Sequence, residues 1–210
     1  MHSIVYHILG AGNPLEPHNH KSRARLDAVL TMPENATAIL YGRQQPDMKA
    51  SEAEHGLHYL QTQNNHIANL ITLNDRPKST SETMKILCDY IEDSYQLNRQ
   101  KPAHGFKAQE VIVTNGPYMP RTRYLLKKQW QRLHPDIPWQ DAKAHVTFLS
   151  VGGTFVPYWK QHGPLAILQW LANPVGYEFF AWIKALRDPF DEKLNQNRKW
   201  SQRLSKLFQR

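Results

Sequence analysis

Four loops of this sequence combine glycines, hydroxyl residues, carboxylates and arginines in places where a ligand could bind. Glu52 and Glu82 each stand at the start of a stretch with helical periodicity, and Arg121 follows a turn formed by Gly116 and Pro117. A carboxylate can accept hydrogen bonds from ligand hydroxyls or act as a base, and an arginine can bind a phosphate or carboxylate. These residue types predict a site for a small anionic ligand, provided that the fold brings the loops together.

The third of these loops leads into the stretch RPKSTSETMKIL, residues 76–87. Ser79 and Glu82 have the spacing of a capping box, in which each side chain bonds the backbone amide of the other residue. Thr80 then falls in the first turn of the helix, where free backbone amides form a natural anion site. Capping and ligand binding are compatible at this position, so the spacing alone does not choose between them.

The second loop ends in another capping box, formed by Ser51 and Glu54. This spacing accounts for Glu54 but leaves Glu52 unexplained. A carboxylate in the first turn gains about 0.3–1 kcal/mol from the helix dipole, so Glu52 has both a structural and a ligand-binding interpretation. His55 and His58 follow Glu52 at intervals of three residues, but no fourth metal ligand is expected, and we predict no metal site.

The first loop, Gly10–Ser22, is about twice as long as most strand-to-helix connections. Its GAG start is similar to a dinucleotide-binding fingerprint, but Leu15 stands where the third glycine should fall. We therefore reject that fingerprint, and no Walker A sequence occurs either. His18 and His20 are interpreted as surface histidines, because two histidines spaced by two in a loop are weak metal ligands.

The fourth loop, Thr114–Tyr124, places Arg121 and Arg123 at a predicted helix start. A cation in this position opposes the helix dipole, which indicates that the arginines have an anionic partner. Glu52, Glu82, a ligand group or surface aspartates could each be that partner.

None of the loops contains a nucleophile and a base at a spacing that identifies a catalytic set. The single cysteine, Cys88, stands in a helical stripe with Met84, Leu87 and Ile91, and we predict that it is a core residue. One cysteine excludes an intrachain disulfide and agrees with a reducing compartment. Whether the protein is an enzyme stays open.

The elements that carry these loops alternate between short apolar runs and helical patterns. The runs are rich in Ile, Val and Leu, as expected of parallel strands covered on both faces. Strands are predicted over Ile4–Leu9, Thr37–Tyr41, Asn69–Leu73, Glu110–Thr114 and Ala144–Leu149. Helices are predicted over Ser22–Met32, Ser51–Gln63, Thr80–Tyr95, and from the fourth loop to about Leu133. We predict a doubly wound, mostly parallel, Rossmann-like α/β sheet of about five strands, with its site at the carboxyl ends of the strands.

The remainder of the chain contains a polar connector at Asn98–Lys107 and helical segments at Pro164–Leu171 and Val175–Leu186. We predict an α/β domain over 1–187 and a basic amphipathic C-terminal helix over 188–210. That helix could dock on the domain, bind a partner or lie on a membrane surface.

The 210 residues carry a formal charge of +8 and a pI of about 9.6, with 40% hydrophobic residues. This is a globular composition, and no window is apolar enough for a spanning helix. We expect a soluble cytoplasmic protein, or one peripheral to a membrane. The charge permits phosphate esters, nucleic acid or acidic lipid as partners, and it also fits a solvated basic surface. Nucleic acid is disfavoured because it rests on charge alone.

Taken together, the loops resemble the bacterial family of domains of unknown function that includes SanA, ElyC and YdcF. The motifs recur in the family's order and spacing, and they cover about residues 4–187. They are ILGAG at Ile8–Gly12, RLDA at Arg25–Ala28, SEAE at Ser51–Glu54, TSET at Thr80–Thr83, VTNGPYMPRT at Val113–Thr122 and PVGYEFFAWIKAL at Pro174–Leu186. The resemblance implies an α/β sheet with its site at the strand carboxyl ends.

The chain departs from the family pattern at three positions. Thr83 replaces an asparagine, Tyr118 replaces a histidine, and Gly42-Arg43 replaces a pair of glycines. If the family histidine were an acid–base catalyst, a tyrosine would replace it poorly, because an ordinary tyrosine titrates near pH 10.

The resemblance implies S-adenosylmethionine-like ligands, or a role in envelope lipid-carrier or peptidoglycan metabolism, in the soluble YdcF-like form. In this hypothesis Arg121 binds an anion, Glu52 or Glu82 binds hydroxyls or acts as a base, and Arg25 supports the pocket. Ligand contacts are predicted from Gly10, Gly12, Asn13, Arg25, Gly42, Glu52, Thr80, Glu82, Asn115, Tyr118 and Arg121. The alternative is a non-catalytic peripheral membrane or protein-interaction module that acts through the basic helix at 190–210.

Overall fold

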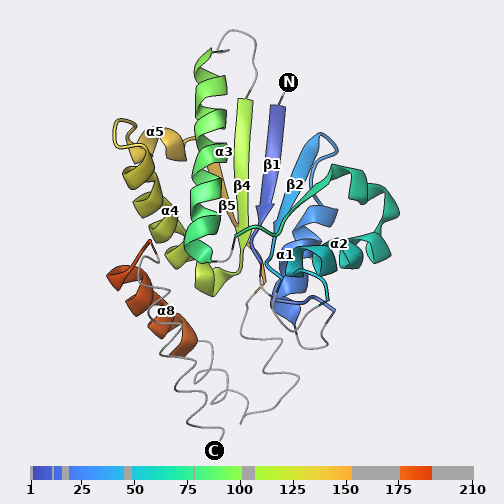
Figure 1. Ribbon diagram of the computed structural model, residues 1–210. Coiled ribbons are helices and arrows are strands. Elements are labelled where there is room, and N and C mark those ends of the chain that lie inside the picture. Colours follow the sequence, from blue (N-terminus) through green and yellow to red (C-terminus); the bar gives the residue numbers. More distant parts are fainter. Residues whose placement is uncertain are drawn as a thin grey trace, which may run out of the picture.

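The computed structural model describes residues 2–10, 12–15, 19–44, 49–77, 79–100, 107–152 and 176–190, and shows a five-stranded sheet (Figure 1). All four strand pairs are parallel, and the strand order is β3-β2-β1-β4-β5. The strands are β1 (His2–Ile8), β2 (Ala36–Tyr41), β3 (Ile71–Asn74), β4 (Lys107–Thr114) and β5 (Val146–Ser150).

The helices follow the strands in alternation and cover both faces of the sheet. They are α1 (His20–Leu30), α2 (Glu52–Gln63), α3 (Thr80–Gln100), α4 (Met119–Leu133), α5 (Trp139–Lys143) and α8 (Gly176–Arg187). Short 3-10 helices lie at Asn65–Leu70 and Gly116–Tyr118. In Figure 1, α1 and α2 lie on one side of the sheet, and α3 and α4 lie on the other.

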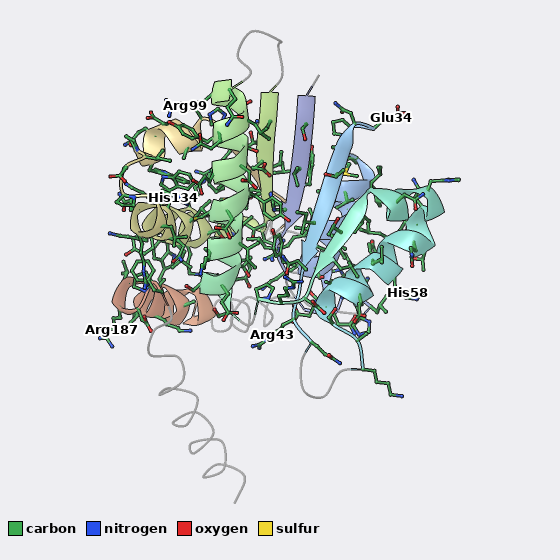
Figure 2. All side chains as sticks on the ribbon, turned by 45° about the horizontal axis from the view of Figure 1, so that its top comes forward. Glu34, Arg43, His58, Arg99, His134 and Arg187 are labelled. Carbon is green, nitrogen blue, oxygen red and sulfur yellow. The ribbon has the colours of Figure 1, made fainter. Side chains whose placement is uncertain are left out.

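The core has two halves, one on each face of the sheet, and adjacent strand residues contribute to opposite halves. Leu40 packs with Leu26 and Leu60 on the face of α1 and α2, whereas its neighbour Ile39 packs with Leu126 on the face of α3 and α4. Figure 2 shows side chains filling the space between the sheet and its helices on both faces. Burial on both faces explains why the strands read as continuous apolar runs.

The chain winds outward from β1 in both directions, which makes the fold doubly wound. It passes from β1 through β2 to β3, and then α3 carries it across the opposite face to β4. The strand order therefore reverses between β1 and β4, and ligands bind at such switch points in open α/β sheets. The predicted Rossmann-like α/β fold is confirmed.

Three expectations about individual elements need correction or fall outside the described residues. The connector predicted over Asn98–Lys107 is wrong at both ends, because α3 continues to Gln100 and β4 begins at Lys107. The Asn98 side chain holds the last turns of α3 against the sheet, since its amide pairs with both the N–H and the C=O of Ala108 at 2.9 Å. The short helix α5 was not predicted. The segment Pro164–Leu171 and residues 191–210 lie outside the described residues.

Two other predictions about buried and helical residues are confirmed. Cys88 is fully buried in the core beside Met84, Leu87 and Ile91, and burial raises the pKa of its thiol to about 12. The helix predicted at 175–186 is α8. Among the described residues, no helix has the length and apolar character needed to cross a membrane.

Candidate functional site

Arg25 lies at the switch point and joins the loops that follow β1 and β4. It is a buried residue of α1, with only 4% of its surface exposed. Its Nε donates to Asn115 Oδ1 at 2.6 Å, and its Nη1 donates to the carbonyl oxygens of Leu9 at 2.7 Å and Gly10 at 2.8 Å. These three acceptors are uncharged, and the bonds fix the position of the guanidinium group.

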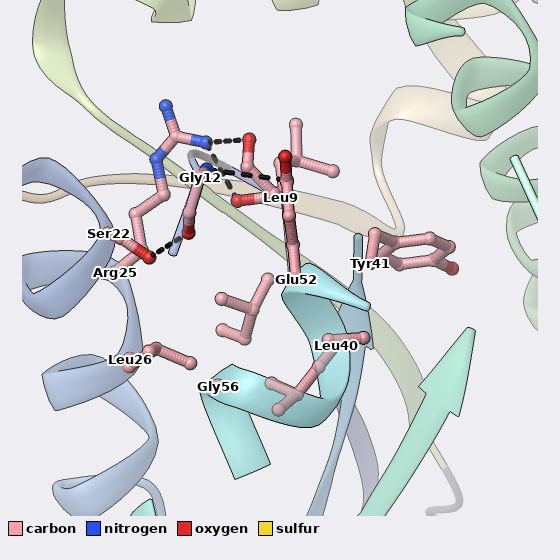
Figure 3. Close-up of a pocket in the computed structure, with 12 residues that line it drawn as sticks. Leu9, Gly12, Ser22, Arg25, Leu26, Leu40, Tyr41, Glu52 and Gly56 are labelled. Carbon is pink, nitrogen blue, oxygen red and sulfur yellow. Dashed lines mark hydrogen bonds between the residues drawn. The ribbon is translucent and has the colours of Figure 1, made fainter. Parts of the chain in front are cut away.

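A small pocket opens beside Arg25, between the loop after β1 and the start of α2 (Figure 3). Its volume of about 260 Å³ includes the open solvent at its mouth. Apolar residues such as Ile8 and Leu40 form part of the lining. Figure 3 shows the side chains of Arg25 and Glu52 converging on the loop that carries Gly12, so the pocket presents one cation and one anion.

Two glycines allow the loop after β1, the end of β2 and the start of α2 to approach one another closely. A side chain at Gly10 would lie 2.6 Å from the carbonyl oxygen of Tyr41 and 3.0 Å from Glu52 Oε2. A side chain at Gly42 would lie 2.6 Å from both the Ala53 amide nitrogen and Glu52 Cβ. Glycine is therefore required at both positions for the present arrangement of the pocket.

Glu52 reaches the pocket because the capping box fixes the first turn of α2. Ser51 Oγ accepts from the Glu54 amide at 3.1 Å, and Glu54 Oε2 accepts from the Ser51 amide at 2.6 Å. The bond from the Ser51 amide favours the charged carboxylate and, with a smaller contribution from the Ser51 side chain, lowers the pKa of Glu54. Glu52 takes no part in the cap, and its Oε2 instead accepts from the Gly12 amide at 3.3 Å. The predicted capping box is confirmed.

Tyr118 lies at the end of a 3-10 turn after β4, and three cations surround its ring. Lys21 Nζ donates to the Tyr118 hydroxyl at 3.0 Å and lies 5.3 Å from the ring centroid. The guanidinium carbons of Arg25 and Arg121 lie 5.4 and 5.8 Å from the same centroid. The negative face of the ring attracts each cation by roughly 0.5–1 kcal/mol, which offsets part of their mutual repulsion.

Arg25 belongs both to the pocket and to this set of cations, which we call the Tyr118 cluster (Lys21, Arg25, Tyr118 and Arg121). The cluster therefore extends the pocket toward the start of α4. Three cations gathered at one place produce a positive field that favours an anion. Lys21 was not predicted, although it stands one helical turn before Arg25 on α1, and this spacing places the two on neighbouring positions of one helix face.

Asn115 connects the strand ends around the site. Besides accepting from Arg25, its Nδ2 donates to the carbonyl oxygens of Val151 at 2.9 Å and Lys21 at 3.3 Å. Asn13 shapes the first loop, since its Oδ1 accepts from the Leu15 amide at 2.9 Å. Asn115 and Asn13 therefore position the loops, and neither lines the pocket.

Thr80 and Glu82 lie at the start of α3, on the other face of the sheet from α2, and both are exposed. Ser79 Oγ accepts from the Glu82 amide at 3.2 Å, which is one half of the predicted capping box. Neither Thr80 nor Glu82 lines the pocket, so their ligand contacts stay a prediction. The structure brings Arg25, Tyr118 and Arg121 together. Gly10, Gly12 and Glu52 line the pocket beside them, and Gly42 packs behind Glu52 and Ala53.

The histidines that were weighed as metal ligands do not form a cluster in the described part of the chain. There, no three His, Cys, Asp or Glu side chains come together in a way that could hold a metal ion. His58 is exposed and lies on α2 (Figure 2), and His20 is exposed at the start of α1. His18 lies outside the described residues.

Comparison of the chain with protein-family models and with curated proteins finds no match. The resemblance to the YdcF-like family therefore stays a prediction from the loop motifs.

Proposed function

We propose that the protein binds a small ligand that carries a phosphate or carboxylate group together with hydroxyl groups. The observation that carries this proposal is the Tyr118 cluster, which gathers three cations next to the pocket that contains Glu52. The anionic group would lie against the Tyr118 cluster, where cations and a phenolic hydroxyl are available. Glu52 would accept hydrogen bonds from the hydroxyls at the pocket end of the ligand.

The position of the pocket supports this proposal independently of its charge. Arg25 bonds the ends of β1 and β4 at the switch point of the sheet, where ligands bind in doubly wound folds. Gly10 and Gly42 pack closely against Glu52, and this packing places the Glu52 carboxylate at the same edge of the sheet as Arg25.

The YdcF-like resemblance narrows the ligand class within this proposal. S-adenosylmethionine carries a carboxylate and ribose hydroxyls, so it has both groups that the site would recognise. Sugar-bearing phosphate esters, including those of envelope lipid-carrier metabolism, also carry an anionic group together with hydroxyls. The geometry supports binding, and we assign no reaction to it.

Isothermal titration calorimetry with ribose 5-phosphate tests the proposal, because this probe carries a phosphate and hydroxyls. Ribose is the neutral comparison, and S-adenosylmethionine is a second probe. We expect Arg121→Gln to weaken the binding of ribose 5-phosphate by about tenfold or more, because a charge-assisted hydrogen bond is lost.

Arg123→Gln is the matched control for Arg121→Gln. Arg123 stands two residues along the same helix, but its guanidinium lies over the Phe148 ring at 4.9 Å instead of facing Tyr118. It should bind the probe like the wild type. Equal affinity of ribose and ribose 5-phosphate, or equal losses in both arginine variants, would remove the anion site from the proposal.

The alternative function, a peripheral module acting through the basic segment at 190–210, stays a prediction from the sequence. Nearly all of that segment lies outside the described residues, and we base no site on it.

A further inference from the structure

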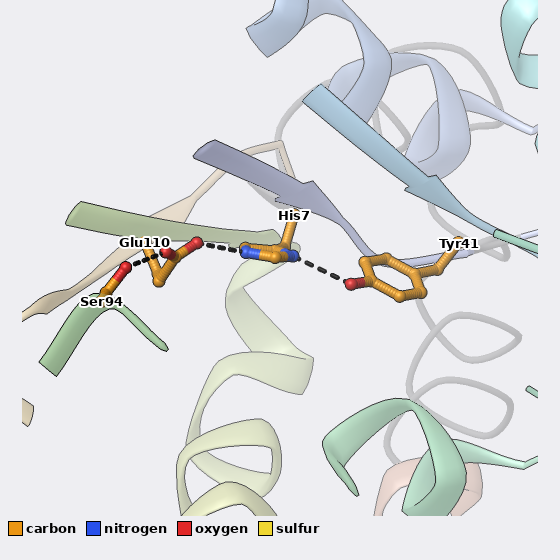
Figure 4. Close-up of polar contacts among 4 residues, drawn as sticks. All are labelled: His7, Tyr41, Ser94 and Glu110. Atoms are coloured by element: carbon orange, nitrogen blue, oxygen red, sulfur yellow. Dashed lines mark hydrogen bonds and ion pairs between the residues drawn. The ribbon is translucent and has the colours of Figure 1, made fainter. Parts of the chain in front are cut away.

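A chain of buried polar side chains lies behind the pocket, centred on His7 of β1 (Figure 4). His7 is fully buried. Its Nδ1 lies 2.9 Å from the Tyr41 hydroxyl of β2, and its Nε2 lies 2.6 Å from Glu110 Oε2 of β4. Ser94 of α3 donates to the other carboxylate oxygen of Glu110. The four side chains, which we call the His7 network, connect three adjacent strands with the helix that covers them.

The His7 network is connected to the wall of the pocket through Tyr41. Tyr41 is the last residue of β2, lines the pocket, and places its carbonyl oxygen against Gly10. His7 stands two residues before Leu9, whose carbonyl oxygen accepts from Arg25. The network therefore fixes the ends of the same strands whose loops form the pocket.

The hydrogen bonds of the network are all satisfied when His7 is neutral. The Tyr41 hydroxyl then donates to Nδ1, Nε2–H donates to the charged Glu110, and Ser94 donates to the remaining oxygen. Burial raises the pKa of Tyr41, with further contributions from Tyr90 and Glu110, so its hydroxyl keeps its proton and acts as the donor.

Addition of a proton to His7 disturbs this arrangement at one end. An imidazolium ion donates from both nitrogens, so Tyr41 must become the acceptor of the Nδ1–H bond. Among the described residues, the Tyr41 hydroxyl makes only its bond to His7, so its own proton would then lack an acceptor in the core. A buried donor without an acceptor is costly, so protonation of His7 would favour a shift of the Tyr41 side chain from its present position.

The groups that face His7 from each packed element determine how it responds to pH. β2 contributes Tyr41, and β4 contributes the Glu110 carboxylate. α3 contributes Tyr90, whose ring centroid lies 5.1 Å from that of His7, and the buried thiol of Cys88 in the same cluster. The residues that α4 contributes to this half of the hydrophobic core are Leu125, Leu126 and Trp130.

We infer that His7 is a positioning residue for the pocket, which holds the Tyr41 wall in place when neutral and weakens ligand binding when it gains a proton. The inference rests on the proposed function, since it concerns the affinity of the same pocket.

The test compares the affinity for ribose 5-phosphate between pH 5.5 and 8 in the wild type and in His7→Gln. Glutamine keeps an amide donor and an acceptor but cannot be protonated in this range. The two proteins differ only at residue 7 and are measured with the same probe, so the difference between the two profiles isolates His7. We expect the wild type to lose about tenfold more affinity at the acidic end than His7→Gln, corresponding to one buried unsatisfied group.

Two further variants make this comparison decisive. His66→Gln removes an exposed histidine and should keep the wild-type profile. Tyr41→Phe removes the hydroxyl through which His7 contacts the pocket wall, so protonation of His7 should no longer act on that wall and the acidic loss should flatten, even if His7→Gln does not fold. A wild-type profile in either His7→Gln or Tyr41→Phe would overturn the inference.

Nitrogen NMR of the imidazole ring tests the same inference without any ligand. We expect the neutral Nε2–H tautomer of His7 at pH 8, and amide shifts at Gly10 and Gly42 that follow its protonation in the wild type but not in His7→Gln. An imidazolium at pH 8, or glycine shifts that ignore His7, would contradict it. If the wild type binds no probe at any pH, the proposed function fails, whereas these signals still decide the role of His7.

Discussion

The Arg25 guanidinium donates to Asn115 Oδ1 across 2.6 Å, and this bond spans the point where the strand order of the sheet reverses. Arg25 comes from the helix after β1, and Asn115 is the first residue after β4. The two residues are 90 positions apart in the chain. Their bond makes the switch point a fixed structure, on which the pocket and the Tyr118 cluster are both built.

Asn115→Ala should destabilise the fold, because the substitution removes three hydrogen bonds from a side chain that is 1% exposed. We expect a loss of roughly 1–3 kcal/mol in the free energy of unfolding, since the buried Arg25 would lose one of its acceptors. Urea denaturation measures it. Gln131→Ala, at an exposed position of α4, should change stability by less than about 0.5 kcal/mol. A similarly small effect at Asn115 would show that its bonds do not stabilise the switch point.

Gly42→Ala should distort the pocket, because the added methyl group would lie 2.6 Å from the Ala53 amide nitrogen and from Glu52 Cβ. Backbone atoms cannot yield as a side chain can, so we expect a loss of about 1–3 kcal/mol in stability and weaker probe binding. Gly56→Ala, on α2, is the matched control for the change in stability only, because Gly56 itself lines the pocket. Its methyl group would meet only side-chain atoms of Leu26 and Leu40, at 3.2 Å and beyond, and alanine favours the helix. Equal effects of the two substitutions would contradict the close approach at Gly42.

The capping box of α2 should make part of the stability depend on pH. The bonds to Ser51 lower the pKa of Glu54 in the folded protein, so the unfolded chain binds a proton first as the pH falls. The contribution of Glu54 is therefore present above about pH 4.5 and is lost as the pH falls through its folded value. Thermal unfolding of Glu54→Gln should show a deficit against the wild type at pH 7 that disappears near pH 3. The exposed Glu34→Gln should show no such pattern, and a deficit at Glu54 that persists unchanged in acid would refute the assignment.

Much of the fold could be predicted because its signals are local. Strands covered on both faces appear as apolar runs, as at Thr37–Tyr41, and the Ser51–Glu54 box marks its helix start to the residue. The extension of α3 was missed because a tertiary contact, the pairing of Asn98 with Ala108, holds its last turns. A sequence window does not contain that contact.

The position of the candidate site could be predicted from the sequence, but only some of its residues could. Parallel topology places every strand-to-helix loop at one edge, so Arg25, Glu52 and Arg121 could be expected there. The Lys21–Tyr118 bond joins residues 97 positions apart, and the His7–Glu110 pair is separated by 103. A signal for the second pair did exist, because a histidine stands within the apolar run Ile4–Leu9 and a glutamate directly precedes the apolar run Val111–Val113.

The Tyr118 ring should matter more for anion binding than its hydroxyl. Tyr118→Phe loses only the bond from Lys21, so we expect affinity for ribose 5-phosphate to fall by roughly two- to tenfold. Tyr118→Ala also removes the face on which three cations gather, and should cost a further factor of about five. Calorimetry at low and high salt measures both, and the losses should shrink at high salt because the interactions are electrostatic.

The control for the Tyr118 variants is Tyr59→Phe, which removes a phenolic hydroxyl that donates to Asp27 at 2.8 Å between α2 and α1. Its affinity should equal that of the wild type, because Tyr59 lines neither the pocket nor the Tyr118 cluster. If Tyr118→Ala binds the probe as tightly as Tyr59→Phe does, the cations around Tyr118 do not form the anion site. The charged group of the ligand would then have to lie against Arg25 inside the pocket alone.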